Sequence, residues 1–301
     1  MITVRVPATT ANLGPGFDCF GMALTLYGYF TFEELPTGLQ FENVPEEFCN
    51  ADNLAVQAYF SALTAMKLQK TGLYLRIESD IPVSRGLGSS ASLIAAGIYA
   101  ANAAHGCPLS DQEMLTLAAK LEGHPDNVAP ALFGGLTVSI MEDGRVLTVP
   151  CPVSEKIRVC ALVPDFELST HRARAVLPQN VAFGDAVFNV SHAAATLRAL
   201  ETGDCKLLAA ALKDRLHQPY RQSLIAEYDD VHTLADACGA AAVCISGAGP
   251  TILCLHENAD FGSRMEKTVL SLQHGWRVLP LQVDHEGASV MKEAEAWTAN
   301  T

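Results

Sequence analysis

The chain of 301 residues carries a formal net charge of −13, with 49% hydrophobic and 18% charged residues. This length and composition predict a chain that folds throughout, most simply into two domains. Nucleic acids and anionic membranes are bound through clusters of Lys and Arg, so the acidic balance argues against both as partners.

The N-terminal segment is predicted to be a strand followed by a polar loop. Apolar and polar residues alternate from Ile2 to Val6, which is the period of a half-buried strand. From Pro7 to Asp18 the regular pattern is lost, which predicts a long loop. A plain connection explains the glycines of this loop well but its polar residues, among them Asn12 and Asp18, less well.

The next predicted elements are a strand at residues 22–32 and a helix from Leu54 to Lys70. The strand is rich in β-favouring residues, and the apolar residues of the helix recur with the spacing of one helical face. Asn53 stands directly before the helix, where an amide side chain is a good N-cap. Capping and a contact to a nucleotide are both open interpretations of Asn53.

A glycine-rich loop lies between a predicted strand at residues 73–77 and a predicted helix that starts at Ser92. Glycines let the backbone approach an anion closely, and a helix start offers free N–H groups and a partial positive charge. We therefore predict that this loop binds phosphate. It comprises Pro82, Val83, Ser84, Arg85, Gly86, Leu87, Gly88, Ser89, Ser90 and Ala91.

Two known phosphate-binding motifs compare differently with this loop. Gly86, Gly88 and Ala91 satisfy the dinucleotide fingerprint G-x-G-x-x-G/A, but the acidic residue expected at the end of a second strand is missing. The Walker loop requires a lysine, and none lies between Lys70 and Lys120. Taken alone, the loop leaves open both a nucleotide site and a simple glycine-containing turn.

Further polar residues follow the helix predicted from residue 111 to Glu122, which begins with a capping box and ends at Gly123. A carboxylate is mildly unfavourable at the negative C-terminal end of a helix, so Glu122 suggests a nearby cation. Asp126 and Asn127 come shortly after it. A solvated glutamate at a helix end is the alternative interpretation.

A domain boundary is predicted after the hairpin signal Asp143-Gly144. Pro150-Cys151-Pro152 interrupts strand and helix patterns, so we predict domains at residues 1–152 and 153–301. The second domain is expected to contain strands at 157–163, 241–246, 251–255 and 276–283, and helices near 184–202, 204–216, 229–238 and 260–273.

Nine cysteines are scattered through the sequence, mostly in apolar runs, which predicts small core residues. The sequence contains no Cys-x-x-Cys or His-Glu-x-x-His motif, so we expect no zinc site. The N-terminus has no apolar signal core, and the longest apolar run is too short for a bilayer. We expect a soluble protein of the cytoplasm.

Three separated segments together resemble the GHMP kinase superfamily, which includes galactokinases, homoserine kinases and mevalonate kinases. They are residues 7–18, 82–91 and 245–251, in the order of that superfamily's three motifs. Within the superfamily, the residues of these motifs are most similar to those of the homoserine kinase family. The resemblance implies an α+β, two-domain GHMP kinase fold, with an N-terminal domain like the second domain of ribosomal protein S5 and a ferredoxin-like C-terminal domain.

The resemblance also implies the substrates, which are ATP and L-homoserine in a step of threonine biosynthesis. The glycine-rich loop and Asn53 would contact ATP, while Ser90 and Glu122 would hold Mg²⁺, an ion that prefers hard oxygen ligands. Matching positions imply an acceptor site with Asn12 and Asp18 on the ammonium group, Arg174 and Arg221 on the carboxylate, and Thr170 and Asn127 as further substrate contacts.

One position carries a choice of mechanism. Where mevalonate kinases have an aspartate as general base, this chain has Asn127, which cannot accept a proton. Phosphoryl transfer depends mainly on positioning and charge neutralisation, so we expect direct in-line attack with Asn127, Ser90 and Glu122 as catalytic residues. Asp126 stays open as a base. Three alternative functions also remain open: a different alcohol kinase of the superfamily, an NAD(P)-dependent oxidoreductase, and a nucleotide-binding protein without catalysis. The oligomeric state is open as well, and a homodimer is one option.

Overall fold

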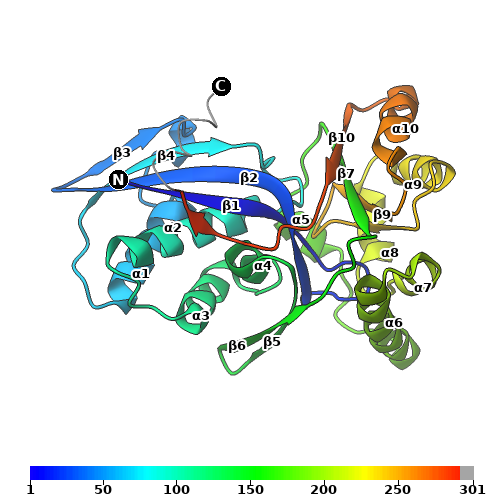
Figure 1. Ribbon diagram of the computed structural model, residues 1–301, viewed down its shortest axis with the longest axis horizontal. Coiled ribbons are helices and arrows are strands. Elements are labelled where there is room, and N and C mark those ends of the chain that lie inside the picture. Colours follow the sequence, from blue (N-terminus) through cyan, green and yellow to red (C-terminus); the bar gives the residue numbers. More distant parts are fainter. Residues whose placement is uncertain (292–301) are drawn as a thin grey trace.

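A largely antiparallel sheet of seven strands forms the first unit of the computed structural model, which describes residues 1–291 (Figure 1). Its strands are β1 (Ile2–Ala11), β2 (Phe20–Leu35), β3 (Leu39–Glu42), β4 (Gly72–Ser79), β5 (Leu136–Glu142), β6 (Arg145–Cys151) and β11 (Ser289–Val290). They follow the order β11-β1-β2-β4-β3, and the β5–β6 hairpin joins the sheet through β2. Strands β3 and β4 run parallel to each other.

The first strand is longer than its sequence pattern predicts. β1 continues to Ala11 and stays paired with β2, but its register shifts between Pro7 and Ala8. Proline has no N–H for the ladder, and every residue from Pro7 to Ala11 is buried, so neither face of this part of the strand calls for solvent-facing polar residues. The alternation is therefore interrupted although Thr9 and Thr10 still lie in the sheet. The predicted loop is wrong for residues 7–11 and correct for residues 12–18.

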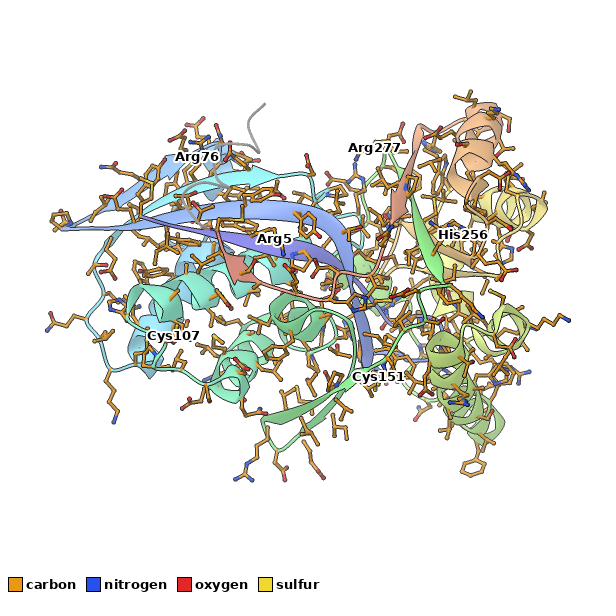
Figure 2. All side chains as sticks on the ribbon, viewed as in Figure 1. Arg5, Arg76, Cys107, Cys151, His256 and Arg277 are labelled. Carbon is orange, nitrogen blue, oxygen red and sulfur yellow. The ribbon has the colours of Figure 1, made fainter. Side chains whose placement is uncertain are left out.

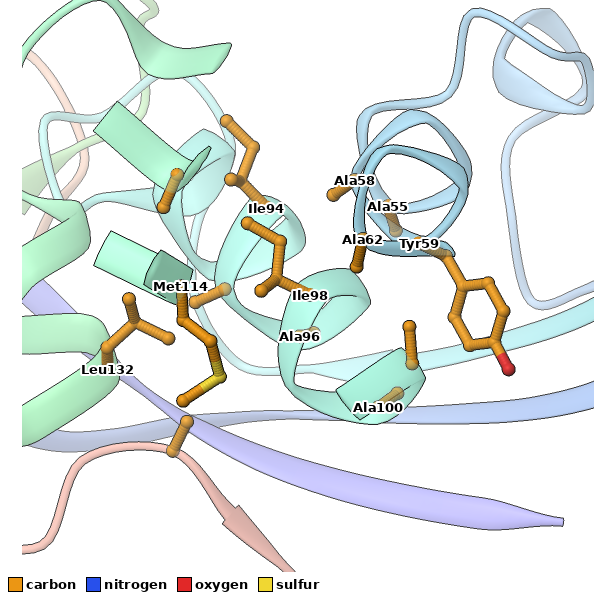
Figure 3. Packing of buried hydrophobic residues seen from close by; sticks show 14 of the residues in the cluster. Ala55, Ala58, Tyr59, Ala62, Ile94, Ala96, Ile98, Ala100, Met114 and Leu132 are labelled. Atoms are coloured by element: carbon orange, nitrogen blue, oxygen red, sulfur yellow. The ribbon is translucent and has the colours of Figure 1, made fainter. Parts of the chain in front are cut away.

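Four helices cover one face of this sheet (Figure 1): α1 (Leu54–Ala65), α2 (Ser89–Ala104), α3 (Asp111–Glu122) and α4 (Val128–Phe133). Helices α1 and α2 pack closely, since a Cβ on Gly97 would lie 2.3 Å from the carbonyl oxygen of Ala55. Figure 3 shows Ile94 and Ile98 of α2 within the apolar layer, and both are fully buried. Burial of one isoleucine contributes roughly 1.5–3 kcal/mol, so this layer fixes α2 and the loop before it.

A four-stranded antiparallel sheet organises the second unit. Its strands are β7 (Arg158–Pro164), β8 (Ala242–Ile245), β9 (Ile252–His256) and β10 (Trp276–Leu281), in the order β10-β7-β9-β8. The helices are α5 (Thr170–Ala175), α6 (Phe183–Thr202), α7 (Cys205–Ala211), α8 (Gln218–Arg221), α9 (Tyr228–Ala237) and α10 (Phe261–Thr268). Helices α6 and α7 pack on one face, and α9 and α10 on the other.

The two units share a hydrophobic core. One buried cluster joins Leu13 and Met22 of the first unit to Val159 and Leu253 of the second. After β10 the chain returns to the first sheet, where β11 pairs with β1. The segment beyond Leu281 packs on the first sheet rather than within the second unit. The domain boundary at residue 152 therefore remains a prediction.

The α+β two-domain fold agrees with the prediction, and most elements lie where they were expected. The capping box of Ser110 and Glu113 is formed at the start of α3. Helix α1 ends at Ala65 rather than Lys70, since Lys67 adopts a left-handed φ of 61°. Within residues 1–291, no helix combines the length and the apolar character needed to cross a membrane.

The cysteines agree only in part with the prediction of core residues. All nine are free, and Cys160, Cys238, Cys244 and Cys254 are buried. Figure 2 shows Cys107 just after α2 and Cys151 at the end of β6. Because Cys107 is exposed, as are Cys19 and Cys49, the prediction is wrong for these three.

Candidate functional site

A cavity of about 160 Å³ lies where the two units meet. Its walls come from the loop after β1, the glycine-rich loop, the segment after α3, the start of α5, the end of α8 and the loop between β8 and β9. Most of the predicted site residues line it: Asn12, Asp18, Ser84, Gly86, Gly88, Ser89, Ser90, Glu122, Asn127, Thr170, Arg174 and Arg221. Residues far apart in the sequence are thus brought together.

The glycine-rich loop needs glycine where it passes other backbone segments. Gly86 and Gly88 have φ values of 76° and 71°, and α2 begins directly after Gly88. A Cβ on Gly86 would lie 2.4 Å from the carbonyl oxygen of Ser246, and one on Gly88 would lie 2.0 Å from Thr9 Oγ1. The loop is therefore held against both units, with the N-terminus of the 16-residue helix α2 directed at the cavity.

Several residues predicted to contact ATP do not line the cavity. Arg85 donates hydrogen bonds to the carbonyl oxygens of Pro164 (3.0 Å) and Asp165 (2.8 Å), so its guanidinium ties the loop to the second unit. Asn53 caps α1 and donates to the carbonyl oxygen of Phe48, which occupies both ends of its amide. The others are Pro82, Val83, Leu87 and Ala91, of which Leu87 and Ala91 are fully buried.

Ser90 and Glu122 form a polar pair in the cavity wall. Ser90 Oγ donates a hydrogen bond of 2.6 Å to Glu122 Oε1. Burial raises the pKa of the Glu122 carboxyl, although the hydrogen bond from Ser90 opposes this effect. The pair presents a hydroxyl and a mostly buried carboxylate, which together are a donor set for a hard cation.

The segment after α3 contributes a histidine that the sequence interpretation did not assign. His124 lines the cavity, and its Nδ1 lies 2.5 Å from Oδ1 of the buried Asp126. Burial lowers the pKa of His124, but the hydrogen bond and the charge of Asp126 outweigh it and raise the pKa. Its place between Glu122 and the polar pair Asp126-Asn127 was the available signal.

Asn127 is held by hydrogen bonds at both ends of its amide. Its Oδ1 accepts a hydrogen bond of 2.8 Å from Thr9 Oγ1, and its Nδ2 donates to Asp126 Oδ1 at 3.3 Å. Asp126 Oδ1 is thus within hydrogen-bond distance of both Asn127 and His124. This network fixes the orientation of the amide at the cavity.

The acceptor side of the cavity, the part lined by the residues predicted to bind the acceptor, contains charges of both signs. Arg174 donates two hydrogen bonds to Asp18, at 2.7 and 3.1 Å. The hydrogen bonding to Asp18 raises the pKa of Arg174. Asn12 Oδ1 accepts from the Asp18 backbone N–H, which fixes the position of that residue. Residues predicted to bind opposite ends of the substrate are therefore paired with each other.

Arg221 is the most buried charge at the site, with an exposure of 1%. Its Nη1 donates to the carbonyl oxygen of Gly247 (3.1 Å), and its Nε donates to that of Ala173 (3.2 Å). Burial, followed by the nearby charge of Arg174, lowers the pKa of Arg221 to about 10. The side chain is still a cation at neutral pH and lines the cavity beside Arg174.

Comparison with known proteins gives one consistent result. The models for the GHMP kinases N terminal domain and the GHMP kinases C terminal match residues 53–135 and 196–266. The homoserine kinase of Clostridium botulinum (strain Alaska E43 / Type E3) is 43% identical over 295 residues, which cover 97% of this chain and 99% of that protein.

Solved structures agree with this result. The homoserine kinase from Cytophaga hutchinsonii has a TM-score of 0.87 and 28% identity, covering 96% of this chain and 97% of that one. The L. major mevalonate kinase, at 17% identity, has a TM-score of 0.72 and covers 95% of this chain and 96% of that one. The latter likeness concerns the fold alone.

Proposed function

This chain belongs to the homoserine kinase family of the GHMP kinases, and we propose that it transfers the γ-phosphoryl group of ATP to the side-chain hydroxyl of L-homoserine. The observation that carries this proposal is the acceptor side of the cavity, where Asp18, Arg174 and Arg221 converge. An amino acid is a zwitterion, and this set offers a carboxylate for its ammonium group and guanidinium groups for its carboxylate.

The Asp18–Arg174 pair supports binding of a zwitterion by exchange. Each side chain would give up the other and take the opposite charge of the substrate, with Asn12 beside the ammonium group and Arg221 beside the carboxylate. The two side chains are 34% and 37% exposed, and an ion pair at that exposure contributes only about 0–1 kcal/mol. Separating them therefore costs little. The hydroxyl of Thr170 is a further contact in this proposal.

The glycine-rich loop supports the ATP side of the proposal, and kinases of this family use ATP. The left-handed residues of the loop and the start of α2 turn backbone N–H groups toward the cavity, as phosphate binding requires. Arg85 and the buried residues Leu87 and Ala91 support the shape of the loop in this proposal, and Asn53 caps helix α1.

Ser90 and Glu122 fit a magnesium ion by their chemistry. A hydroxyl and a carboxylate 2.6 Å apart in the cavity wall are hard oxygen ligands of the kind that Mg²⁺ takes, together with waters and phosphate oxygens. When bound, Mg²⁺ would neutralise charge on the phosphate oxygens. A cation would also relieve the unfavourable burial of the Glu122 carboxylate.

Asn127 supports a mechanism that relies on positioning. Its amide cannot take a proton, and the bonds from Thr9 and to Asp126 leave it rigid. We propose that Asn127 orients the acceptor hydroxyl for in-line attack on the γ-phosphate, with Asp126 as the alternative base. A cytoplasmic location and a homodimer remain part of the proposal.

The proposal is tested with a coupled assay that measures ADP release. Homoserine, mevalonate, galactose and shikimate are supplied in turn as the acceptor. We expect turnover with L-homoserine alone. Selective turnover of another alcohol would refute the assigned acceptor while leaving the kinase chemistry in place. ATP hydrolysis without any acceptor preference would refute the role of the Asp18–Arg174–Arg221 set.

A further inference from the structure

A buried polar cluster lies beneath the acceptor side of the cavity and takes no part in the steps described above. It consists of Asn189, Asp214 and His217, and it adjoins Arg221. His217 is fully buried, as is the side chain of Asp214, and Asn189 is 3% exposed. Buried polar groups are costly unless they are satisfied, so the contacts of this cluster reveal its role.

Asp214 fixes the backbone at the start of α8. Its carboxylate accepts hydrogen bonds from the backbone N–H groups of Leu216 (3.0 Å), His217 (2.9 Å) and Gln218 (2.6 Å). It also accepts from Asn189 Nδ2 at 2.8 Å. The backbone that carries His217 is therefore held rigidly, one helical turn before Arg221.

The contacts of the His217 ring define its protonation state. Nε2 donates a hydrogen bond of 2.8 Å to the carbonyl oxygen of Gly14. Nδ1 lies 3.3 Å from Arg221 Nη1, and a guanidinium can only donate, so Nδ1 must be an acceptor. His217 is thus neutral with its proton on Nε2, and burial lowers its pKa in the same direction. Asp214 Oδ2 is farther from Nε2, at 3.6 Å.

The aromatic ring of Phe17 completes the support. The His217 ring stacks on it with centroids 5.1 Å apart, and Arg221 Cζ lies 5.2 Å from its centroid. Phe17 and Gly14 belong to the same loop as Asn12 and Asp18. His217 therefore contacts the loop of the proposed ammonium site and the arginine of the proposed carboxylate site at once.

We propose that His217 is a positioning residue for the amino-acid acceptor, holding Arg221 in place and fixing it relative to the loop that carries Asn12 and Asp18. This inference rests on the proposed function, because it assigns Arg221 to the acceptor carboxylate. His217 does not touch the substrate. It acts by accepting a hydrogen bond from Arg221 and by donating one to Gly14.

The test compares His217→Phe, which keeps a ring on Phe17 but loses both hydrogen bonds, with His217→Gln, whose amide can both accept and donate. Loss of a hydrogen bond to a charged group predicts a rise in KM for homoserine of roughly 10- to 100-fold in His217→Phe. KM for ATP should stay within about twofold, as a contact confined to the acceptor requires. His217→Gln should recover most of the homoserine affinity.

Two controls separate positioning from general damage. His192→Gln removes a half-buried histidine of α6 that bonds within its own helix, and it should leave all kinetic constants unchanged. The analogue 3-aminopropan-1-ol lacks the carboxylate, so the wild type and His217→Phe should use it equally poorly. A homoserine KM in His217→Phe equal to that of the wild type, or an equal rise in KM for ATP, would overturn the inference.

A measurement on the wild-type protein tests the contact independently of the variants. Nitrogen NMR of the histidines, with His217 assigned through His217→Gln, should find a neutral ring protonated at Nε2 at pH 7. A protonated imidazolium could not accept from Arg221 and would overturn the inference. Failure of the wild type to phosphorylate homoserine would refute the proposed function, and this spectrum would still decide whether His217 supports Arg221.

Discussion

Gly88→Ala should damage both stability and catalysis, because the structure leaves no room for a methyl group at this position. The residue has a φ of 71°, and a Cβ would lie 2.0 Å from Thr9 Oγ1. Thr9 cannot turn aside freely, since its hydroxyl donates the hydrogen bond that holds Asn127. The left-handed backbone costs an alanine about 1 kcal/mol, and the lost hydrogen bond about 0.5–1.5 kcal/mol. We expect a loss of about 2 kcal/mol in the free energy of unfolding.

Gly106→Ala is the matched control for this prediction. Gly106 has a similar φ of 78°, but no atom lies within 4 Å of its Cβ position. Its variant should therefore show only the backbone cost of about 1 kcal/mol and normal kinetics. Urea unfolding measures both variants, and ADP release measures kcat, which should fall at least about tenfold in Gly88→Ala as Asn127 loses its support. Equal stability of the two variants, with normal kcat in Gly88→Ala, would refute the argument.

Three further substitutions test the residues at the cavity. Glu122→Gln should lower kcat by orders of magnitude and weaken the dependence on magnesium concentration; a normal magnesium titration would remove Glu122 as a ligand. Asn127→Asp should slow the reaction, because it places a second carboxylate at the 3.3 Å contact with Asp126, whereas a faster enzyme would establish general-base catalysis. Arg174→Lys should raise KM for homoserine roughly tenfold or more through loss of the fork geometry. Its KM for ATP and its unfolding midpoint should hardly change, since the bond to Asp18 is partly exposed, and an unchanged homoserine KM would contradict the assignment.

Local patterns in the sequence predicted the elements whose cause is local. The capping box of Ser110 and Glu113 marks the start of α3, and Asp143-Gly144 forms the turn between β5 and β6, with φ values of 50° and 74°. Both features depend on residues that are neighbours in the chain. The end of β1 was missed because Pro7 interrupts the alternation while the partner strand maintains the pairing.

The candidate site was predictable as a set of residue types but not as a geometry. Arg85 stands in the glycine-rich loop, and only the fold reveals that its guanidinium reaches across to the carbonyl oxygens after β7. His124 lies beside a proline and has no periodic pattern that assigns it a role. Its pairing with Asp126 becomes evident only from the structure. His217 is 203 residues from Gly14, so no local pattern could connect them.

The third motif explains how the three parts of the site keep their relative positions. Ser246 Oγ donates to the carbonyl oxygen of Gly86 at 2.6 Å, which anchors the glycine-rich loop. The carbonyl oxygen of Gly247 accepts from Asn12 Nδ2 at 2.8 Å and from Arg221 Nη1 at 3.1 Å. One turn between β8 and β9 therefore bonds to the phosphate side and to both halves of the acceptor side. Because phosphoryl transfer depends on the relative placement of donor and acceptor more than on covalent chemistry by the protein, we expect this uncharged turn to contribute to catalysis through geometry alone.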